Sequence, residues 1–411
     1  MERDAASEVS AVWRLESARL VAGLTRMTRD VGLAEDLAQD ALVAALEQWP
    51  AGGVPRNPGA WLMAVAKRRA VDHFRRAETL RRRTAELGRD LEEVHVPDLD
   101  AVVDHIEDDV LRLMFLTCHP SLPKESRAAL TLRLVGGLTT QEIARAFLTK
   151  DTTIGQRISR AKRTLEGASF DLPTDAGRRR RLADVMSVVY LVFNEGYSAT
   201  AGDDWTRPDL CHEALRLARM LAALVPDEPE VLGLQALLEI QASRLGARTR
   251  EDGAPVLLED QDRRRWDMLL IRRGLDALTR AEGLGKPVGP YVVQAEIAAC
   301  HARARTAEQT DWPRIVELYD VLASAAPSPV LEVNRAVAHG RALGPEAGLV
   351  VLDGLYDGPL ARSHLLPAVR GDLLARAGRA EEAGAAFREA AALTQNEGER
   401  TVLLGRADEI T

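Results

Sequence analysis

The sequence predicts an all-α protein that is divided into two or three helical domains. Its 411 residues exceed the size of one ordinary domain. Aromatic residues make up only 4% of the chain, whereas Ala, Leu, Arg and Glu are abundant, and this composition favours helices over sheets. Apolar residues recur at intervals of three and four in the N-terminal part, and residues 172–411 show no strand-like alternation.

Residues 10–49 form the first predicted helical stretch, and a loop at 50–58 separates it from the next helix. The apolar positions that mark the stretch are Leu15, Leu20, Leu24, Leu33, Leu37, Ala41, Leu42 and Leu46. The loop, PAGGVPRNP, contains too much Gly and Pro for a helix. A helix resumes at Ala60 and continues through WLMAVAKRRAVDHFRRAETLRRR, with one apolar stripe and cations on its other faces. The stripe consists of Leu62, Val65, Ala66, Ala70 and Phe74.

The charges in this part of the chain are sorted into blocks. The whole net charge of −8 arises in residues 171–411, because residues 1–170 contain 25 basic and 25 acidic side chains. Residues 61–83 carry eight basic and two acidic side chains, whereas residues 84–109 carry one basic and ten acidic ones. The basic block is a candidate surface for a polyanion, and we interpret residues 84–104 as an acidic linker.

A pattern of two short helices follows in residues 138–165, LTTQEIARAFLTKDTTIGQRISRAKRTL. Thr139 and Glu142 have the spacing of a capping box, which predicts the start of a helix. The inner face of that helix consists of Ile143, Ala144 and Phe147. Asp151 is the expected N-cap of the second helix. The apolar stripe of the second helix, expected to pack against the first, consists of Ile154, Ile158, Ala161 and Leu165.

The face of the second helix opposite its apolar stripe is polar and basic. It contains Gln156, Arg160 and Arg163, flanked by Thr152, Thr153 and Arg157. A helix that is held by a partner and presents amides, hydroxyls and guanidinium groups is suited to reading the DNA major groove. A plain helical hairpin with a solvated basic face is an equally good interpretation of the segment alone.

Residues 172–411 predict a short solenoid of helix pairs. Two windows, EALRLARMLAALVPDEPEVLGLQALLEI and LPAVRGDLLARAGRAEEAGAAFREAAAL, have small residues where paired helices must approach closely. Looser copies lie around RRGLDALTRA and PRIVELYDVLASAAPSPVLEVNRAVA. Units of this kind bury their apolar faces on one another and often provide a concave binding surface.

Metal, cofactor and membrane functions find no support in the sequence. Cys118, Cys211 and Cys300 are widely spaced, which predicts buried thiols rather than disulfides or metal ligands, and the eight histidines show no metal-binding spacing. The chain contains no run of eighteen apolar residues, and MERDAASEVS lacks a signal-peptide core. We therefore expect a cytoplasmic protein that uses neither a metal nor a cofactor and has no membrane partner.

Two segments resemble regions 2 and 4 of bacterial RNA polymerase sigma factors of the extracytoplasmic-function type. Residues 33–83 resemble region 2 through LAEDLAQDALVAALEQW and WLMAVAKRRAVDHFRR, and residues 105–166 resemble region 4 through the helix-turn-helix pattern. The remainder resembles the tetratricopeptide-like extension of one group of these factors. The segments that carry this third resemblance are LVFNEGYSAT, LEDQDRRRWD, GPYVVQAEIAA, TDWPRIVELYD and PSPVLEVNRAVA.

The resemblance implies four parts in the chain. These are region 2 in residues 10–83, the acidic linker in 84–104, region 4 in 105–170 and a tetratricopeptide-like regulatory domain in 172–411. In region 2 the resemblance implies contact with core RNA polymerase, on the clamp helices of the largest subunit, through Asp36, Leu37, Gln39 and Asp40. A capped helix with an ordinary solvated face is the alternative for these four residues.

The resemblance also implies two sets of promoter contacts. The set for the minus-ten element is Trp61, Lys67, Arg68, Arg69, Asp72, Arg75 and Arg76. The set for the minus-thirty-five element is Thr152, Thr153, Gln156, Arg157, Arg160 and Arg163. Base preferences do not transfer, because many family members have Asn in place of Arg68 and a Gly-Thr-Val stretch in place of Thr152-Thr153-Ile154. A simple core position is the alternative for Trp61.

These expectations together describe a non-enzymatic promoter-specificity subunit. It would bind core polymerase, recognise and melt promoter DNA, and be tuned by its helical extension. One alternative is a ligand- or protein-sensing helical repeat with the DNA-binding regions as its output. A further alternative is an enzyme that uses the polar clusters at 194–197 and 259–262, although helix caps and salt bridges between repeats account for those clusters as well.

Overall fold

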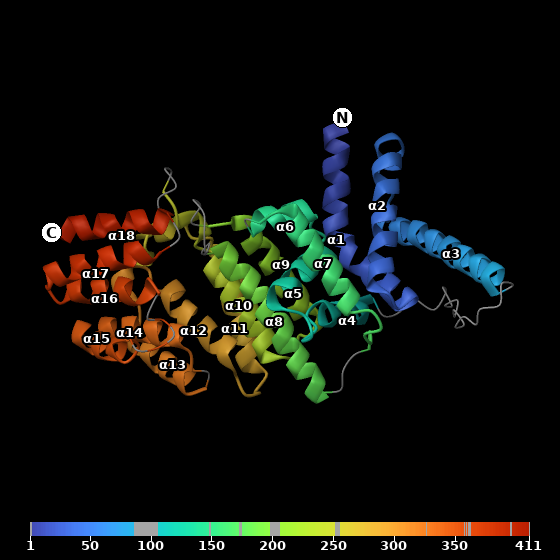
Figure 1. Cartoon of the computed structure of the whole chain (residues 1–411). Helices are drawn as coiled ribbons and strands as arrows, with labels where there is room; N and C mark the ends of the chain where they lie inside the picture. The colour runs from blue at the N-terminus through green and yellow to red at the C-terminus, as the bar shows by residue number, and fades with distance from the viewer. Residues whose placement is uncertain are drawn as a thin grey trace. The chain divides into compact units, whose positions relative to one another are not determined.

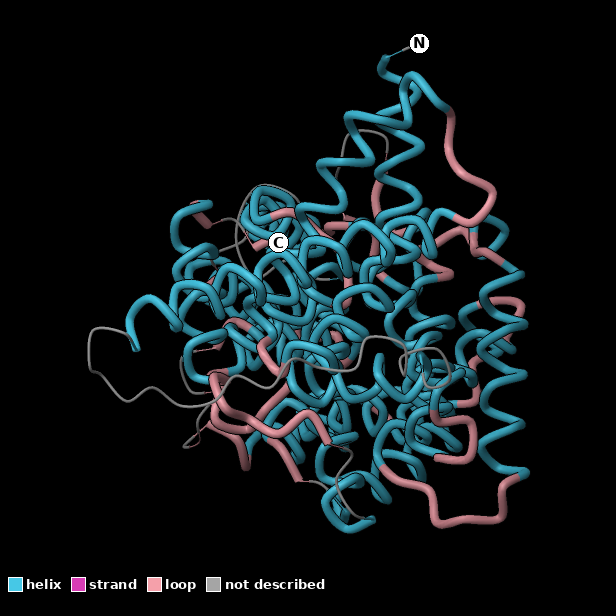
Figure 2. The backbone as a smooth tube through the Cα atoms, turned by 90° about the vertical axis from the view of Figure 1, so that its right-hand side faces the viewer, coloured by secondary structure: helices cyan, strands magenta, loops and turns pink. Residues whose placement is uncertain are grey.

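The computed structural model describes residues 2–85, 106–147, 149–171, 175–197, 206–250, 255–325, 327–356, 358, 360, 363–394 and 397–410. In these residues the regular structure is helical, apart from one isolated β-bridge between Thr249 and Pro255 (Figure 2). The all-α prediction is therefore confirmed. From residue 86 on, the predicted acidic linker lies outside the described residues.

The chain divides into two compact units, Met1–Val188 and Val189–Thr411, and the boundary falls inside one helix, α8. The helices of the first unit are α1 (Glu2–Thr28), α2 (Val31–Gly52), α3 (Pro58–Ala85), α4 (Ile106–Thr117), α5 (Lys124–Leu134), α6 (Thr140–Ala146), α7 (Asp151–Thr164) and the beginning of α8 (Asp175–Tyr197) (Figure 1). In this unit α1 packs against α2, α3, α4 and α5. Helices from residues 31–85 and from residues 106–134 thus share α1 as a partner.

The turn between α1 and α2 is tight and well capped. Arg29 has a positive φ of 53°, and Asp30 accepts hydrogen bonds from the backbone amides of Gly32 (2.7 Å) and Leu33 (3.0 Å). Such a cap satisfies amides that have no partner within the helix. The predicted loop at 50–58 is shorter than expected. Residues 53–57 are non-helical, but α2 continues through Pro50 to Gly52, with Gly53 (φ 77°) as its C-cap, and α3 begins at Pro58. Pro50 has no amide hydrogen to donate to the preceding turn, and the helix ends two residues after it.

The helix-turn-helix has most of the predicted core. Ile143 and Ala144 of α6 are buried, as are Ile154, Ile158, Ala161 and Leu165 of the second stripe, whereas Phe147 is only half-buried. The predicted capping box is confirmed, since the Glu142 amide donates to Thr139 Oγ1 (3.1 Å) and the Thr139 amide donates to Glu142 Oε2 (2.7 Å). The predicted cap of the second helix is wrong, because Asp151 is already helical and Lys150 occupies the N-cap position without a side-chain hydrogen bond.

The second unit is a series of helices that pack on their neighbours in the chain. It contains the end of α8, α9 (Pro208–Leu224), α10 (Pro229–Ala242), α11 (Met268–Gly283), α12 (Pro290–Arg303), α13 (Trp312–Ala325), α14 (Pro329–Leu343), α15 (Pro345–Asp353), α16 (Leu365–Arg376), α17 (Ala380–Leu393) and α18 (Glu397–Ile410). Four 3-10 turns interrupt the series, namely η1 (Leu245–Ala247), η2 (Leu258–Asp260), η3 (Arg263–Arg265) and η4 (Ala307–Gln309). Extensive contacts join α9 to α10, α13 to α14, α14 to α15, α16 to α17 and α17 to α18. This arrangement confirms the prediction of a helical-repeat domain.

Small residues allow the close approaches that the repeat pattern predicts. A Cβ atom added to Gly371 of α16 would lie 2.7 Å from the ring of Phe387 in α17, and one added to Gly233 of α10 would lie 2.6 Å from the backbone nitrogen of Val292 in α12. Real Cβ atoms do not come so close to other atoms, so a larger residue would push the helices apart. Phe387 is fully buried in the core of the last helices, together with Leu352, Leu366 and Leu373.

Candidate nucleic-acid interface

The helix α7 exposes the side chains that the sequence predicts for the minus-thirty-five element. Thr152, Gln156, Arg160 and Arg163 are exposed, whereas Thr153 and Arg157 are half-buried. In the described part of the chain, the guanidinium groups of Arg157, Arg160 and Arg163 form no ion pair. The polar face of α7 is therefore available to a ligand outside this unit.

The orientation of α7 depends on α6 and, through α6, on α1. Glu142 closes the capping box of α6 and also accepts a hydrogen bond from Arg14 Nη2 at 2.8 Å. Burial opposes ionisation of Glu142, but its hydrogen bonds from Thr139 and Arg14 lower the pKa below the ordinary value. A charged carboxylate at this position both starts α6 and links it to α1.

The helix α3 carries a second basic face. Arg68, Asp72, Arg75 and Arg76 are exposed, and Lys67 and Arg69 are half-buried. The predicted stripe of α3 lies on the opposite side, where Leu62, Val65, Ala66 and Ala70 are buried and only Phe74 is half-exposed. The burial of this stripe fixes which cations face outward.

Trp61 lies at the start of α3 and contacts α2. Its ring meets that of Trp49 edge to face, with the ring centroids 5.3 Å apart. Trp49 is buried, whereas Trp61 is half-buried and keeps part of its surface exposed. The ring therefore supports the core and is also accessible from outside.

The predicted polymerase-contact residues on α2 are in different environments. Asp36 and Asp40 are exposed, Gln39 is half-buried, and Leu37 is buried with 4% of its surface exposed. Asp40 receives an ion pair from Arg69 of α3, with 3.0 Å between Oδ2 and Nη1. Leu37 therefore supports α2 from inside and does not belong to its outer face.

The contact between α2 and the helix-turn-helix is centred on a residue that sequence reasoning missed. Glu35 is buried, and its carboxylate accepts a hydrogen bond from Arg133 Nε of α5 at 2.6 Å. Lys162 of α7 forms an ion pair with the same carboxylate and lies 4.0 Å from Asp36. The sequence pattern could have identified this residue. Glu35 lies four residues after Val31 and three before Ala38, on the buried face of α2, where a charge needs a partner.

A groove separates α7 from α2 and α3 beyond this ionic cluster. It has a volume of about 460 Å³ and is lined by Asp36 of α2, His73 of α3, and Ser159 and Arg163 of α7, among others. The structure thus brings together residues that the resemblance assigns to polymerase contact and to the minus-thirty-five element. It does so within one compact unit.

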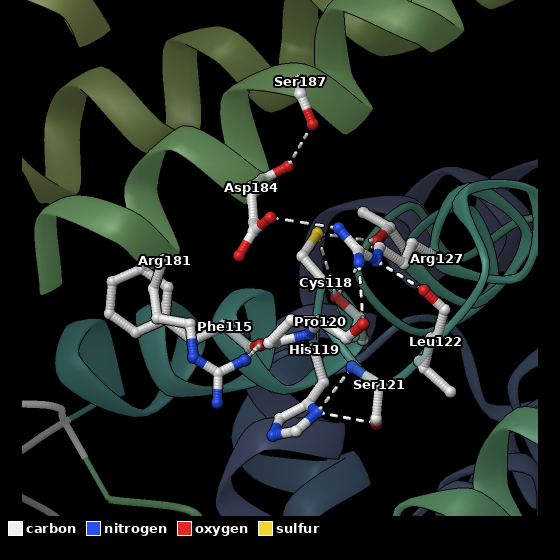
Figure 3. Close-up of polar contacts among 12 residues, drawn as sticks. Phe115, Cys118, His119, Pro120, Ser121, Leu122, Arg127, Arg181, Asp184 and Ser187 are labelled. Atoms are coloured by element: carbon white, nitrogen blue, oxygen red, sulfur yellow. Dashed lines mark hydrogen bonds and ion pairs between the residues drawn. The ribbon is translucent and has the colours of Figure 1, made fainter. Parts of the chain in front are cut away.

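The helix-turn-helix region is also attached to the first part of α8 (Figure 3). Arg127 of α5 forms an ion pair with Asp184 of α8 at 3.0 Å and donates to the carbonyl oxygens of Leu122 (2.8 Å) and Pro120 (3.0 Å). Arg181 donates to the carbonyl oxygen of Phe115 at 3.4 Å. Residues 175–188 therefore pack with region 4.

The polar groups beside this attachment are poorly suited to nucleophilic chemistry. Cys118 is fully buried next to Thr117 and Thr131, and burial raises the pKa of its thiol to about 11. His119 lies beside it, and burial followed by the charges of Arg181 and Arg127 lowers the pKa of its imidazole. A protonated thiol with a raised pKa is a poor nucleophile.

The two clusters considered for enzymatic chemistry are occupied by ion pairs. Glu195 pairs with Arg207. Glu259 accepts from Arg341 Nη1 at 2.7 Å and from Arg376 Nη2 at 2.8 Å. Among the described residues no group of three His, Cys, Asp or Glu side chains is arranged to hold a metal ion, and no described helix is long and apolar enough to span a membrane.

A helix-turn-helix with an exposed basic face, together with a second basic helix, defines a helical DNA-binding protein. Comparison with known families agrees with both regions, since residues 14–79 match "Sigma-70 region 2" and residues 112–165 match "Sigma-70, region 4". Residues 181–282 match a family of unknown function, DUF6596.

Similar proteins cover either the whole chain or its first part. The "Uncharacterized protein R00370" of Rhizobium meliloti (strain 1021) is 44% identical over 396 residues, which are 94% of this chain and 92% of that protein. The ECF RNA polymerase sigma factor SigK of Mycobacterium sp. (strain KMS) is 30% identical over 38% of this chain and 80% of its own length. The probable ECF RNA polymerase sigma factor SigI of Mycobacterium tuberculosis (strain CDC 1551 / Oshkosh) is 31% identical over 42% of this chain and 59% of its own length.

The chain belongs to the extracytoplasmic-function RNA polymerase sigma factors and carries a long helical extension. The predicted resemblance is thereby confirmed. Among solved structures, a tetratricopeptide repeat protein from Parabacteroides merdae ATCC 43184 aligns over 66% of this chain and 98% of its own, with a TM-score of 0.34 and 13% identity. That score is too low to assign a shared fold to the extension.

Proposed function

We propose that this sigma factor binds core RNA polymerase through α2, opens promoter DNA with α3 and reads the upstream element with α7. The proposal rests on a feature that α3 and α7 share. In both helices an apolar stripe is buried in unit 1, so the cations and amides are held on the outer face. Cations near DNA release counterions and provide affinity, and polar groups at base edges provide selectivity.

The residues proposed for promoter opening are Lys67, Arg68, Arg69, Asp72, Arg75 and Arg76, with Trp61 beside them. Arg75 and Arg76 are the best test, because both are exposed. We expect Arg75→Ala with Arg76→Ala to reduce promoter opening at least tenfold, measured by permanganate reactivity of unpaired thymines in the presence of core polymerase. The matched control is Arg272→Ala with Arg273→Ala, another exposed arginine pair on a helix, in the second unit.

If the two double variants open the promoter to the same extent, α3 is not the opening surface. If both fail, the loss reflects total charge rather than the place of the charge. Only a selective loss in the α3 variant supports the proposal.

For polymerase contact we propose the exposed acids Asp36 and Asp40 and the half-buried Gln39, with Leu37 fixing the helix from inside. We expect Asp36→Arg to weaken equilibrium binding of core polymerase at least tenfold, because a cation would replace the anion at an exposed point of the surface. The control is Glu47→Arg, since Glu47 is an exposed acid on the same helix. Equal affinities of the two variants would remove Asp36 from the interface.

For the upstream element we propose Thr152, Thr153, Gln156, Arg157, Arg160 and Arg163. Gln156 and Arg160 are both exposed, and Gln156 lies four residues before Arg160. Residues four apart lie on one face of a helix. Substitution of Gln156 is expected to change base preference, and substitution of Arg160 is expected to weaken binding.

We also propose that the protein acts without catalysis of its own. Support comes from Glu195 and Glu259, because arginine ion pairs occupy both carboxylates. Although burial opposes ionisation, the arginine hydrogen bonds and charges lower the pKa of Glu259, which makes this carboxylate a poor general acid at neutral pH. A chemical turnover that persists after loss of residues 1–170 would contradict this part of the proposal.

A further inference from the structure

The second unit contains a cavity of about 310 Å³ that the sigma-factor role does not use. It is bordered by α12, α13, α14, α16 and α18 and by the segment that includes η2 and η3. Its apolar lining includes Leu257, Leu258, Trp312, Val337, Val369 and Leu403. Because a water molecule occupies about 30 Å³ in the liquid, the cavity holds roughly ten non-hydrogen atoms. Small-molecule sites in proteins have this size and this mainly apolar character.

The carboxylates that line the cavity are already bound by protein groups. Asp372 is paired with Arg406 (2.6 Å) and Arg376 (3.2 Å), and Glu259 is paired with Arg341 and Arg376. Burial opposes ionisation of Glu259 and Asp372, but the arginine hydrogen bonds and charges lower the pKa of both. Glu399, the third acid of the lining, is hydrogen-bonded to Thr394 and lies 3.2 Å from His364 Nε2. All three acids are therefore satisfied, and they leave no free anion to attract a cation.

One cation of the cavity, Arg263, has no acid partner in the described part of the chain, and another, Arg341, is paired with Glu259 but has one nitrogen atom without a partner there. Arg263 forms no ion pair among the described residues. Within that set its guanidinium donates only to neutral acceptors, the carbonyl oxygens of His301 (2.5 Å) and Ala304 (2.7 Å) and Thr310 Oγ1 (3.5 Å). The Nε atom of Arg341 is buried and has no hydrogen-bond partner. A buried donor without a partner is costly, and a ligand acceptor would remove that cost.

The histidine in the cavity wall carries no charge of its own. Burial, followed by the charges of Arg244, Arg263 and Arg341, lowers the pKa of His301 to about 3. Its imidazole is neutral at neutral pH, so it adds no charge to the site. Arg263 thus brings to this end of the cavity a positive charge that no described acid pairs with, and a ligand anion could pair with it.

We propose that this cavity binds one small carboxylic acid anion with an apolar body, whose carboxylate lies against Arg263 and Arg341. The planar guanidinium fork matches a carboxylate in two hydrogen bonds. A sugar phosphate fits poorly, because its hydroxyl groups would lack partners along the apolar wall. A neutral apolar molecule would leave the Arg341 donor unsatisfied. Binding does not depend on polymerase, so this proposal and the proposed promoter function fail or succeed separately.

Octanoate is the probe, because its ten non-hydrogen atoms match the volume. Calorimetric titration of the full chain, below the concentration at which octanoate forms micelles, is expected to show saturable binding of one molecule. Two comparison ligands separate the contribution of the carboxylate charge from that of the apolar body. 1-Octanol lacks the charge and butyrate lacks most of the apolar body, and each is expected to bind at least tenfold more weakly, which corresponds to about 1.4 kcal/mol.

Two variants place the site. Val402 lines the cavity from α18, so Val402→Trp is expected to fill it and to weaken octanoate binding at least tenfold. Val350, an exposed valine of α15 that does not line the cavity, provides the control Val350→Trp. Arg341→Met is expected to weaken octanoate binding about tenfold and to leave 1-octanol binding unchanged.

Three results would overturn the proposal. These are absence of saturable octanoate binding to the folded chain, equal affinity for octanoate and 1-octanol, and equal octanoate affinity of the two tryptophan variants. If Arg341→Met does not fold, the pair of tryptophan variants still decides the location, and the pair of eight-carbon ligands decides the charge requirement.

Discussion

Replacing Glu35 by Gln is expected to loosen the contact between α2 and the helix-turn-helix. The carboxylate is buried and holds two cations, Arg133 at 2.6 Å and the ammonium of Lys162. Both partners have limited exposure, 17% for the Arg133 side chain and 21% for that of Lys162. Glutamine has nearly the same shape, so the change removes the charge and little packing.

The magnitude follows from the burial of the cluster. Breaking a fully buried ion pair by removing one partner costs about 3–5 kcal/mol, because the remaining charge is left unpaired. Here the two cations are partly exposed and Gln retains a hydrogen-bond acceptor, so we expect a loss of about 2 kcal/mol in the free energy of unfolding. For a unit of this size that loss lowers Tm by about 4–8 °C.

Asp36→Asn is the matched control. Asp36 is the neighbouring acid, and it lies 4.0 Å from the same Lys162, but its side chain is 80% exposed. An exposed pair contributes about 0.5 kcal/mol or less. The assay is calorimetric unfolding of the full chain, with amide hydrogen exchange to locate the change. Faster exchange is expected in α2 and α7 for Glu35→Gln and not for Asp36→Asn.

Equal Tm values for the two variants would refute the reasoning, because the buried cluster would then contribute no more than the exposed pair. A double-mutant cycle of Glu35→Gln with Lys162→Met adds a direct measure of the pair. We expect a coupling of about 1–2 kcal/mol. A coupling near zero would show that Lys162 does not stabilise the contact.

Three further predictions concern single side chains. Between pH 6.5 and about 3 the unfolded chain binds one more proton at His301 than the folded chain does, so the stability of the protein falls as the pH falls. We expect His301 to account for a loss of about 2 kcal/mol in the free energy of unfolding between pH 7 and pH 5. His301→Gln should therefore flatten the calorimetric pH profile in this range. Because burial raises the pKa of Cys118 to about 11, its thiol should resist alkylation at pH 8 in the folded chain and react after unfolding, as mass spectrometry would detect. Arg127→Met removes the ion pair with Asp184 and two hydrogen bonds to carbonyl oxygens, and it should lower the free energy of unfolding by about 2 kcal/mol, as measured by denaturant unfolding. The control Arg145→Met, at an exposed position of α6, should change this free energy by less than about 0.5 kcal/mol.

Local patterns predicted the local structure well. The Thr139 and Glu142 spacing was sufficient for the capping box, because that motif depends only on residues three apart. The apolar spacing of α7 likewise identified which side of the helix is buried. The errors concern helix ends, at Pro50 and at Asp151, where one residue more or less of helix depends on small differences in free energy.

The contacts between distant segments were not predictable in this way. Glu35 is separated from Arg133 by 98 residues. Periodicity indicates that Glu35 lies on a buried face, but it contains no information on which cation satisfies it. The cavity in the second unit was not predictable from the sequence for the same reason, because its lining comes from separate segments between residues 257 and 406.

The predicted site residues also differ in how far local sequence patterns could predict their environment. Those whose role depends on one helix face, such as Arg75 and Gln156, are exposed as expected. Leu37 was assigned to the same set as Asp36 by resemblance alone, and the two neighbouring positions of α2 have different environments, since Leu37 is buried and Asp36 is exposed. The polar cluster at Glu259 was open to an enzymatic interpretation until its arginine partners, 82 and 117 residues away, were placed beside it.

Reconstituted run-off transcription tests the central claim most directly. Core RNA polymerase is combined with the full chain on genomic DNA fragments, and the start sites are mapped. The account predicts transcripts that begin downstream of a shared pair of promoter elements, that are absent with core alone, and that Gln156→Ala with Arg160→Ala abolishes while Arg272→Ala with Arg273→Ala does not. Transcripts that start at the same sites with core alone, or that survive the α7 changes at full strength, would contradict it.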